Sequence, residues 1–351
     1  MSVSSPASAN FAAHRSVTQG MSFLSFQTAA QALHPACDAA SVLGGTRLGT
    51  ITAAEWPEQT LPAVLSASSA QSGLLRECWL AFQPCIGGHD EGIAWRRAGD
   101  LLYGVIELDE AGFAGASASP LQAAAEAAYR RIFRLLDAQG LPELWRAWNY
   151  MAAINRETRG LERYRQFNIG RQNAFDAARG AGCRIPAACA LGLADGPLSI
   201  AFMAGREAIV PIENPRQISA WRYPEDYGPR SPTFSRAALA YPPGQEVLFI
   251  SGTASIVGHR TLHADDVAAQ TRESLLNVLT VLEEANRVAR AGPFRAEGLS
   301  CRAYLRHAGD LPVVDALVRE MLGGAEVCYL EADVCRADLL VEIEAMALQT
   351  R

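Results

Sequence analysis

Residues 245–258 read QEVLFISGTASIVG, a run of apolar and small residues that predicts β-strands ending in a turn. From about Asp265 to Arg290 the period changes, and apolar side chains recur every three or four residues, which predicts a long amphipathic helix. The apolar stripe of this helix consists of Ala268, Leu275, Val278, Leu279 and Leu282. Strands followed by a helix in this order predict an α+β unit, a mixed sheet with helices on one face.

The same order of elements occurs earlier in the chain. Residues 79–83 and 100–108 predict strands, and residues 121–139 predict the helix that follows them. A shift of 146 residues places RIFRLLDAQ (131–139) on NVLTVLEEA (277–285), so two copies of one unit are expected. The first copy is expected to close with a helix at 173–179 and strands at 187–193 and 198–203, and the second with the segments 313–322, 326–334 and 339–347.

The predicted organisation has four parts. Residues 1–77 are rich in Ala, Ser and Gln with weak periodicity, and are expected to form an irregular N-terminal segment. Residues 78–209 and 244–351 are the two α+β units. The connection between them, 210–243, is rich in Pro, Arg and Tyr. Because such an aromatic content is unusual for a linker, we expect this connection to be ordered and to contribute to the functional site.

The composition of the 351 residues excludes several functions. All 31 basic residues are arginines, which excludes the lysine of a phosphate-binding loop or of a Schiff base. The formal net charge of −6 argues against a nucleic acid or an anionic membrane as a partner. No membrane-spanning run or secretory leader is visible, so a cytoplasmic location is expected. Eight cysteines without a C-x-x-C pair and six scattered histidines predict no metal site, and no cofactor is expected.

A candidate anion site lies in LERYRQFNIGRQNAF (161–175), where three arginines alternate with aromatic residues. Guanidinium groups bind carboxylates through two parallel hydrogen bonds, and aromatic neighbours exclude water. Tyr164 stands seven residues before Arg171, and Tyr223 stands seven residues before Arg230. Two such pairs could hold a dianion. The alternative is a solvated, arginine-rich surface turn.

A candidate acid lies in the strand LLVEIEAMA (339–347). Its alternation places Val341, Ile343 and Ala345 on one face and Glu342 and Glu344 on the other. Near a dry pocket, desolvation and the like-charged neighbour would raise the pKa of one carboxyl and leave it able to donate a proton at neutral pH. The alternative is a polar outer face of the sheet.

These motifs together resemble a known enzyme family. The SG strand, the D-x-x-x-Q-T helix start and the closing V-E-I-E-A strand of the C-terminal unit are similar to those of RidA/YjgF-type proteins. With LERYRQFNIGR and WRYPEDYGPRSP upstream, the chain from about Cys78 to its end resembles the chorismatases, which cleave chorismate to pyruvate and a ring acid. The resemblance implies two RidA-like units in one chain, a pseudo-trimeric arrangement completed by the N-terminal part, and a monomer or weak dimer.

The resemblance also assigns roles to residues. It implies Glu342, and not Glu344, as the proton donor, and Tyr164, Arg171, Tyr223 and Arg230 as substrate contacts, with no cofactor or metal. RidA proteins carry an arginine fifteen residues before this glutamate, and the corresponding residue here is Val327. Imine hydrolysis, the RidA activity, is therefore not expected.

The product depends on two positions that vary among chorismatases. Ala254 resembles the residue of the simple hydrolases, whereas Cys335 resembles that of the 3-hydroxybenzoate formers, and we expect Cys335 to lie beside Glu342 through pairing of the last two strands. The expected products are pyruvate and a hydroxybenzoate, 3-hydroxybenzoate before 4-hydroxybenzoate. The alternatives are a hydrolase that releases the dihydroxycyclohexadiene carboxylic acid, and a RidA-like module that binds a small ligand or a protein without turnover.

Overall fold

Two six-stranded mixed sheets make up most of the molecule, in a computed structural model that describes residues 23–30, 38–65, 75–180 and 183–351. The first unit contains, in chain order, β5 (Ile86–Asp90), β6 (Ile93–Ala98), β7 (Leu101–Leu108), α1 (Pro120–Gln139), β8 (Glu143–Ala152), α2 (Arg163–Arg179), β11 (Ala187–Leu193) and β12 (Leu198–Gly205). The second contains β13 (Val210–Ile212), β14 (Ala237–Ala240), β15 (Gln245–Ala254), α3 (Val267–Val288), β18 (Ser300–Leu305), α4 (Leu311–Leu322), β19 (Glu326–Glu331) and β20 (Val341–Thr350).

The two sheets have the same topology. Their strand orders are β5-β6-β7-β12-β8-β11 and β13-β14-β15-β20-β18-β19, which match strand for strand along the chain. In each sheet one pair is parallel, β8 with β11 and β18 with β19, and the other pairs are antiparallel. This identity of order and direction confirms the predicted α+β class and the predicted duplication.

The N-terminal segment forms a third, reduced copy. Its strands β1 (Leu24–Ala30), β2 (Val42–Leu48), β3 (Glu58–Leu61) and β4 (Leu75–Ala81) pair in the order β1-β4-β2-β3, with β2 and β3 parallel. The four strands β7-β12-β8-β11 repeat this order and these directions. The described residues here contain a short 3-10 helix (Ala39–Ser41) but no α-helix.

This segment forms a regular sheet, whereas its composition predicts an irregular segment. Strands β2 and β4 are buried along nearly their whole length, so they lack the apolar-polar alternation by which a strand is recognised in a sequence. The predicted boundary at residue 78 falls inside β4, and the connection 210–243 contains β13 and β14, the first strands of the second sheet.

The remaining elements are short: β9 (Glu157–Thr158), β10 (Leu161–Glu162), β16 (Ile256–Val257), β17 (Arg260–Thr261) and the 3-10 helices Glu110–Phe113, Ala220–Arg222, Glu225–Tyr227, Ala296–Gly298 and Ala308–Asp310.

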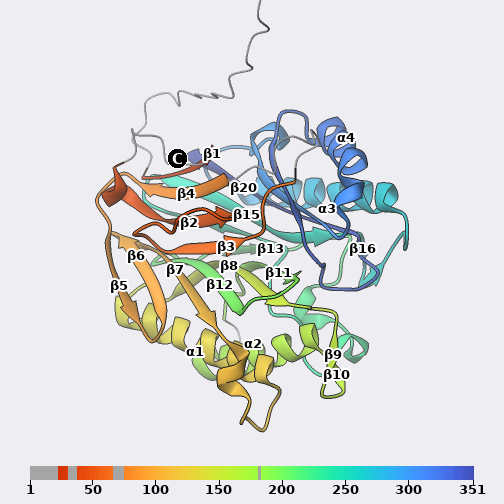
Figure 1. Cartoon of the computed structure of the whole chain (residues 1–351). Helices are drawn as coiled ribbons and strands as arrows, with labels where there is room; N and C mark the ends of the chain where they lie inside the picture. The colour runs from red at the N-terminus through yellow and green to blue at the C-terminus, as the bar shows by residue number, and fades with distance from the viewer. Residues whose placement is uncertain (1–22, 31–37, 66–74, 181–182) are drawn as a thin grey trace, which may run out of the picture.

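The sheets pack against one another in the middle of the molecule, and the helices cover their outer faces (Figure 1). The central core combines side chains of all three sheets, such as Trp79, Trp148 and Phe249. Helix α1 begins at an N-cap, Ser119, whose side chain accepts from the backbone N–H of Gln122 at 3.2 Å. Within the described ranges, no helix is long and apolar enough to span a membrane.

Candidate active site

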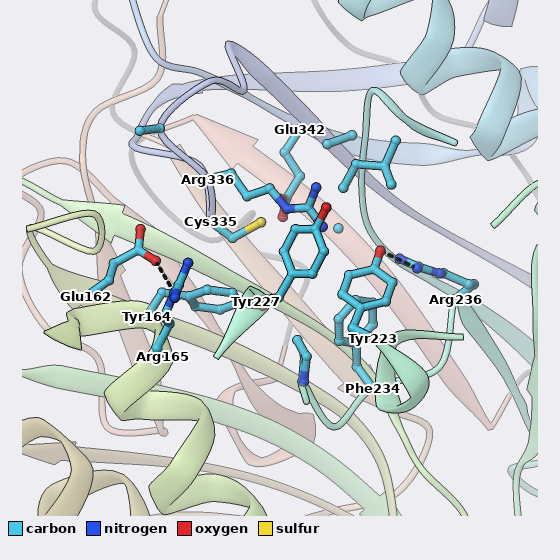
Figure 2. Close-up of a pocket in the computed structure, with 15 residues that line it drawn as sticks. Glu162, Tyr164, Arg165, Tyr223, Tyr227, Phe234, Arg236, Cys335, Arg336 and Glu342 are labelled. Carbon is cyan, nitrogen blue, oxygen red and sulfur yellow. Dashed lines mark hydrogen bonds and ion pairs between the residues drawn. The ribbon is translucent and has the colours of Figure 1, made fainter. Parts of the chain in front are cut away.

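A cavity of about 240 Å³ lies where the first unit, the connection 210–243 and the second unit meet (Figure 2). Behind it lies a smaller hollow of about 30 Å³. Both are lined by Tyr164, Phe234, Gly252, Cys335 and Glu342. The larger cavity adds Glu162, Arg165, Tyr223, Tyr227, Pro232, Arg236, Ala254, Ile256, Arg336 and Ala337, and the smaller adds Arg171, Ala188, Cys189 and Ala190.

Glu342 is a buried carboxyl on the wall of both spaces. It is 3% exposed on β20, between Ala254 of β15 and Tyr304 of β18. Burial raises its pKa to about 8, the negative charge of Glu344 adds to this shift, and Arg146 opposes it. At neutral pH the carboxyl is therefore mostly protonated. The predicted alternation of the strand is confirmed, and the alternative of a polar outer face is wrong.

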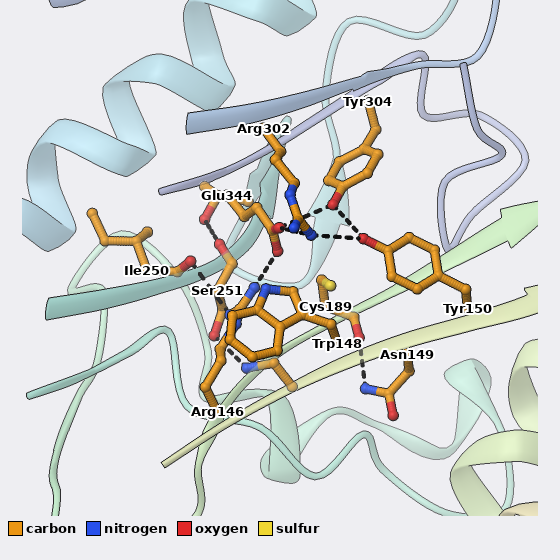
Figure 3. Close-up of polar contacts among 12 residues, drawn as sticks. Arg146, Trp148, Asn149, Tyr150, Cys189, Ile250, Ser251, Arg302, Tyr304 and Glu344 are labelled. Atoms are coloured by element: carbon orange, nitrogen blue, oxygen red, sulfur yellow. Dashed lines mark hydrogen bonds and ion pairs between the residues drawn. The ribbon is translucent and has the colours of Figure 1, made fainter. Parts of the chain in front are cut away.

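Glu344 lies on the same face and is held by cations (Figure 3). Its carboxylate accepts from Arg146 of the first unit, from Arg302 Nη1 at 3.4 Å and from the hydroxyl of Tyr304 at 2.9 Å. Arg302 also donates to Glu77 of the N-terminal sheet through Nε, at 2.9 Å. A polar cluster contributed by all three sheets thus lies directly beside the candidate acid.

The internal repeat relates these ion pairs. Arg146 and Arg302 occupy matching R-A-aromatic triplets on β8 and β18. Arg146 bonds to Glu344 of the second unit, as Arg302 bonds to Glu77 of the N-terminal sheet. By the strand pairings, the counterparts of Glu342 are Leu75, opposite Leu48, and Ala201, opposite Trp148. Of the three equivalent positions, one carries an acid.

Tyr164 and Arg171 both lie on α2, where Tyr164 lines both spaces and Arg171 lines the smaller hollow. Arg171 is 1% exposed, its Nη2 donates to Asn168 Oδ1 at 3.1 Å, and its guanidinium lies 5.0 Å from the ring of Phe167. Its Nε and Nη1 are buried and have no hydrogen-bond partner among the described residues. A guanidinium with two such donors on the wall of a small hollow is suited to an anion. The segment forms the start of a buried helix, which is longer than the predicted 173–179, so the alternative of a surface turn is wrong.

In the connection, the structure brings Tyr223 to the cavity but not Arg230. Arg230 has a side chain that is 47% exposed, lies 4.0 Å from Asp176 and lines neither space. Arg236 lines the larger cavity instead, and its Nη2 donates to the hydroxyl of Tyr223 and to the carbonyl of Ile218, each at 2.8 Å. The seven-residue spacing therefore does not identify the arginine of the connection that lines the cavity, and a substrate contact by Arg230 stays a prediction. The spacing could not identify Arg236, because the chain turns back between Tyr223 and β14 and this turn brings the two side chains together.

Arg336 is a further cation that the sequence analysis missed. Its guanidinium lies 4.2 Å from the ring of Tyr227, and its Nη1 donates to the carbonyl of His259 at 2.9 Å. The signal in the sequence that could have identified Arg336 was its position next to Cys335, which the sequence already places among the candidate site residues. In the described ranges, no group of three His, Cys, Asp or Glu side chains could hold a metal ion.

Cys335 and Ala254 both line the larger cavity. Cys335 lies in the connection between β19 and β20 rather than on a strand, and β19 pairs with β18, not with β20. The predicted strand pairing is therefore wrong, although the cysteine and Glu342 do line the same spaces. Burial, with a contribution from Glu342, raises the pKa of the thiol to about 12, so it remains protonated at neutral pH.

Comparisons with known proteins identify relatives of this chain. Residues 77–204 match the family model described as "Chorismatase FkbO/Hyg5-like, N-terminal". A chorismatase of Streptomyces rapamycinicus is 40% identical over 77% of this chain and 81% of its own length. A 3-hydroxybenzoate synthase of Streptomyces hygroscopicus is 35% identical over 78% of this chain and 81% of its own length. A crystal structure of a chorismatase superimposes with a TM-score of 0.81 at 32% identity, over 92% of this chain and 98% of that one.

Proposed function

The chain belongs to the chorismatase family of chorismate-cleaving enzymes, and on this premise we propose that Glu342 protonates the methylene carbon of chorismate's enolpyruvyl ether. The observation that carries the proposal is a carboxyl with a pKa of about 8 on the wall of an arginine-lined cavity. An enol ether is stable until its terminal carbon is protonated, and this step needs an acid that is still protonated at neutral pH.

The reaction begins when the acidic proton of Glu342 forms a bond to the methylene carbon. The double bond supplies the electron pair, and an oxocarbenium ion results. Water or a ring hydroxyl then attacks this ion and loses a proton, which the carboxylate of Glu342 accepts. The acid is regenerated. On the water route, the hemiketal collapses to pyruvate and the diene diol. On the ring-hydroxyl route, the cyclic ketal loses the ring proton at C3 while the C4–O bond breaks, which aromatises the ring, and the remaining hemiketal collapses to pyruvate and 3-hydroxybenzoate.

Chorismate is a dianion, and two buried arginines suit its two carboxylates. Arg171 has a buried Nε and Nη1 without a hydrogen-bond partner among the described residues, and it lines the small hollow that Glu342 also lines, so we place the enolpyruvyl carboxylate there. Arg236, with a buried Nε that has no partner among the described residues, is placed on the ring carboxylate in the larger cavity. Binding of both carboxylates fixes the distance from the carboxyl of Glu342 to the methylene carbon.

For the product we propose 3-hydroxybenzoate before 4-hydroxybenzoate. Chorismate converts to pyruvate and hydroxybenzoate without net uptake of water, so the pocket must exclude water from the oxocarbenium carbon. The protonated thiol of Cys335 and the methyl group of Ala254 lie on the cavity wall and present weakly polar surface there. The relative named 3-hydroxybenzoate synthase supports this choice.

Incubation of the purified protein with chorismate tests the proposal. Pyruvate release is followed by a coupled assay, and the ring products are separated by chromatography. Pyruvate with 3-hydroxybenzoate is the expected result. Pyruvate with the diene diol alone would identify a hydrolase. Binding of chorismate without turnover would favour the non-catalytic module.

The variant Cys335→Ala separates shielding from packing. If the thiol shields the oxocarbenium ion, its loss admits water, and the share of the diene diol among the products rises. An unaltered product ratio would assign Cys335 to packing alone.

A further inference from the structure

We propose that Gly252 and the β-bulge that contains it are a positioning device for the proton donor: glycine is required there because the carboxyl group of Glu342 occupies the space of a side chain at residue 252. This inference rests on the proposed role of Glu342. It concerns β15, whose backbone runs beside the acid through a break in the regular pairing with β20.

The register of the two strands shows the bulge. Ile250 pairs with Ala345 and Thr253 pairs with Ile343, so Ser251 and Gly252 together stand opposite the single residue Glu344. An extra residue in one strand shifts the side chains that follow it and re-aims them. Beyond the bulge, the ladder resumes with Ala254 opposite Glu342.

Ser251 anchors the bulge from three directions. Its backbone N–H donates to the carbonyl of Arg236 at 3.0 Å, and its hydroxyl donates to the carbonyl of Ser235 at 2.6 Å. The same hydroxyl accepts from the N–H of Ala188 on β11 at 2.9 Å. These bonds join the bulge to the backbone of Arg236, so one local structure sets both the acid and a cation of the cavity.

Gly252 itself is in contact with the acid. A Cβ at this residue would lie 1.9 Å from Glu342 Oε1 and 2.7 Å from its carboxyl carbon, with the Cβ of Cys189 at 3.2 Å on another side. The backbone of Gly252 is outside the left-handed region, so an L-residue fits its conformation. The requirement for glycine is therefore one of space, and the space is filled by the catalytic group.

Gly252→Ala tests this directly. The methyl group would push the carboxyl of Glu342 away from the methylene carbon, and a displacement of about 1 Å lowers kcat by about 100-fold. KM should change by less than about fivefold, because Arg171 and Arg236 keep their places. The matched control is Gly309→Ala, an exposed glycine whose Cβ would meet nothing within 4 Å, and it should keep both constants.

A double variant separates positioning from general damage. Aspartate at position 342 is one methylene shorter, so Gly252→Ala in a Glu342→Asp background meets less obstruction. The double variant should be no slower than the slower single variant. Losses that multiply, or a folded Gly252→Ala protein with wild-type kcat, would overturn the inference.

If Gly252→Ala does not fold, Ser251→Ala replaces it. Loss of the hydroxyl frees the bulge, and kcat should fall by about tenfold with KM little changed. An unchanged kcat would overturn the inference. Its failure is distinct from failure of the proposed function: in the first case Glu342→Gln is inactive while the Gly252 and Ser251 variants are normal, and in the second Glu342→Gln itself turns over.

Discussion

Glu342 is kept as an acid by its surroundings. It is buried, it stands two residues from Glu344, and Arg146, the cation that opposes the rise of its pKa, is engaged by that second carboxylate. For a buried carboxyl that forms no ion pair among the described residues, burial and a neighbouring negative charge favour the protonated form. The strand alternation was enough to predict this pair. It could not identify Arg146 and Arg302, because they come from other strands.

The pH dependence of the reaction follows from this arrangement. In the proposed mechanism the active form of Glu342 is the protonated one, so kcat/KM should fall above a pH near 8. In Glu344→Gln the negative charge is removed, ionisation of Glu342 becomes easier, and its pKa falls. The alkaline limb of the pH-rate profile should therefore move to lower pH, by about half a unit or more.

Glu77→Gln is the control for that shift. Glu77 is as buried as Glu344 and shares Arg302 with it, but it does not contribute to the pKa shift of Glu342. Both variants lose a buried ion pair, and the limb should move in Glu344→Gln alone. Equal shifts in the two variants would assign the effect to general loosening of the cluster.

The arginines provide a second test at the scale of residues. Arg171→Met removes a charge-assisted contact of about 1.5–3 kcal/mol, so KM for chorismate should rise by about 10- to 100-fold. Arg230→Met should leave KM unchanged, because Arg230 is exposed and lines neither space. Steady-state kinetics of the two variants decides between them. A rise in KM for Arg230→Met without one for Arg171→Met would instead support the substrate contact that the seven-residue spacing predicts for Arg230.

Among the elements, α2 connects packing to binding. It carries Tyr164 and Arg171 and packs against α1 at Gly170, where a Cβ would lie 2.1 Å from the carbonyl oxygen of Gln122. The helices therefore approach closely because this residue has no side chain. The tyrosine and the arginine were predictable from the sequence, but the predicted helix begins ten residues late, because the polar residues of 163–172 hide its period.

Gly170→Ala should separate the two helices. Overpacking at such a contact costs about 1–3 kcal/mol, which lowers the thermal midpoint by several degrees. Because Arg171 is the next residue, KM for chorismate should rise as well. Thermal unfolding and steady-state kinetics measure both effects. Gly112→Ala, at a glycine with open space around it, should show neither.

At the scale of the whole molecule, three copies of one sheet surround a common core, and one of three equivalent positions carries the acid. Sequence repeats predicted two copies, since both keep helices with a clear apolar stripe. The third could not be predicted, because its strands β2 and β4 are buried along nearly their whole length and no α-helix marks it in the described residues. Its contribution to the site is indirect: Glu77 binds Arg302, which in turn contacts Glu344.

The residues of the site also differ in how far the sequence predicts them. Glu342, Tyr164, Arg171 and Tyr223 lie within motifs of consecutive residues, where spacing and chemistry can be read together. Arg236 depends on how the connection folds back, so no local pattern points to it. Contacts between segments that are far apart in the sequence could therefore not be predicted.

Pyruvate release by Glu342→Gln shows whether Glu342 supplies the proton. The amide has the shape of the acid but no acidic proton, so release from chorismate should fall below about 1% of the wild-type rate. Calorimetry should show that chorismate still binds within about tenfold of the wild-type affinity, a difference of about 1.4 kcal/mol. Turnover near the wild-type rate in this variant would contradict the account, because the proton would then come from another group.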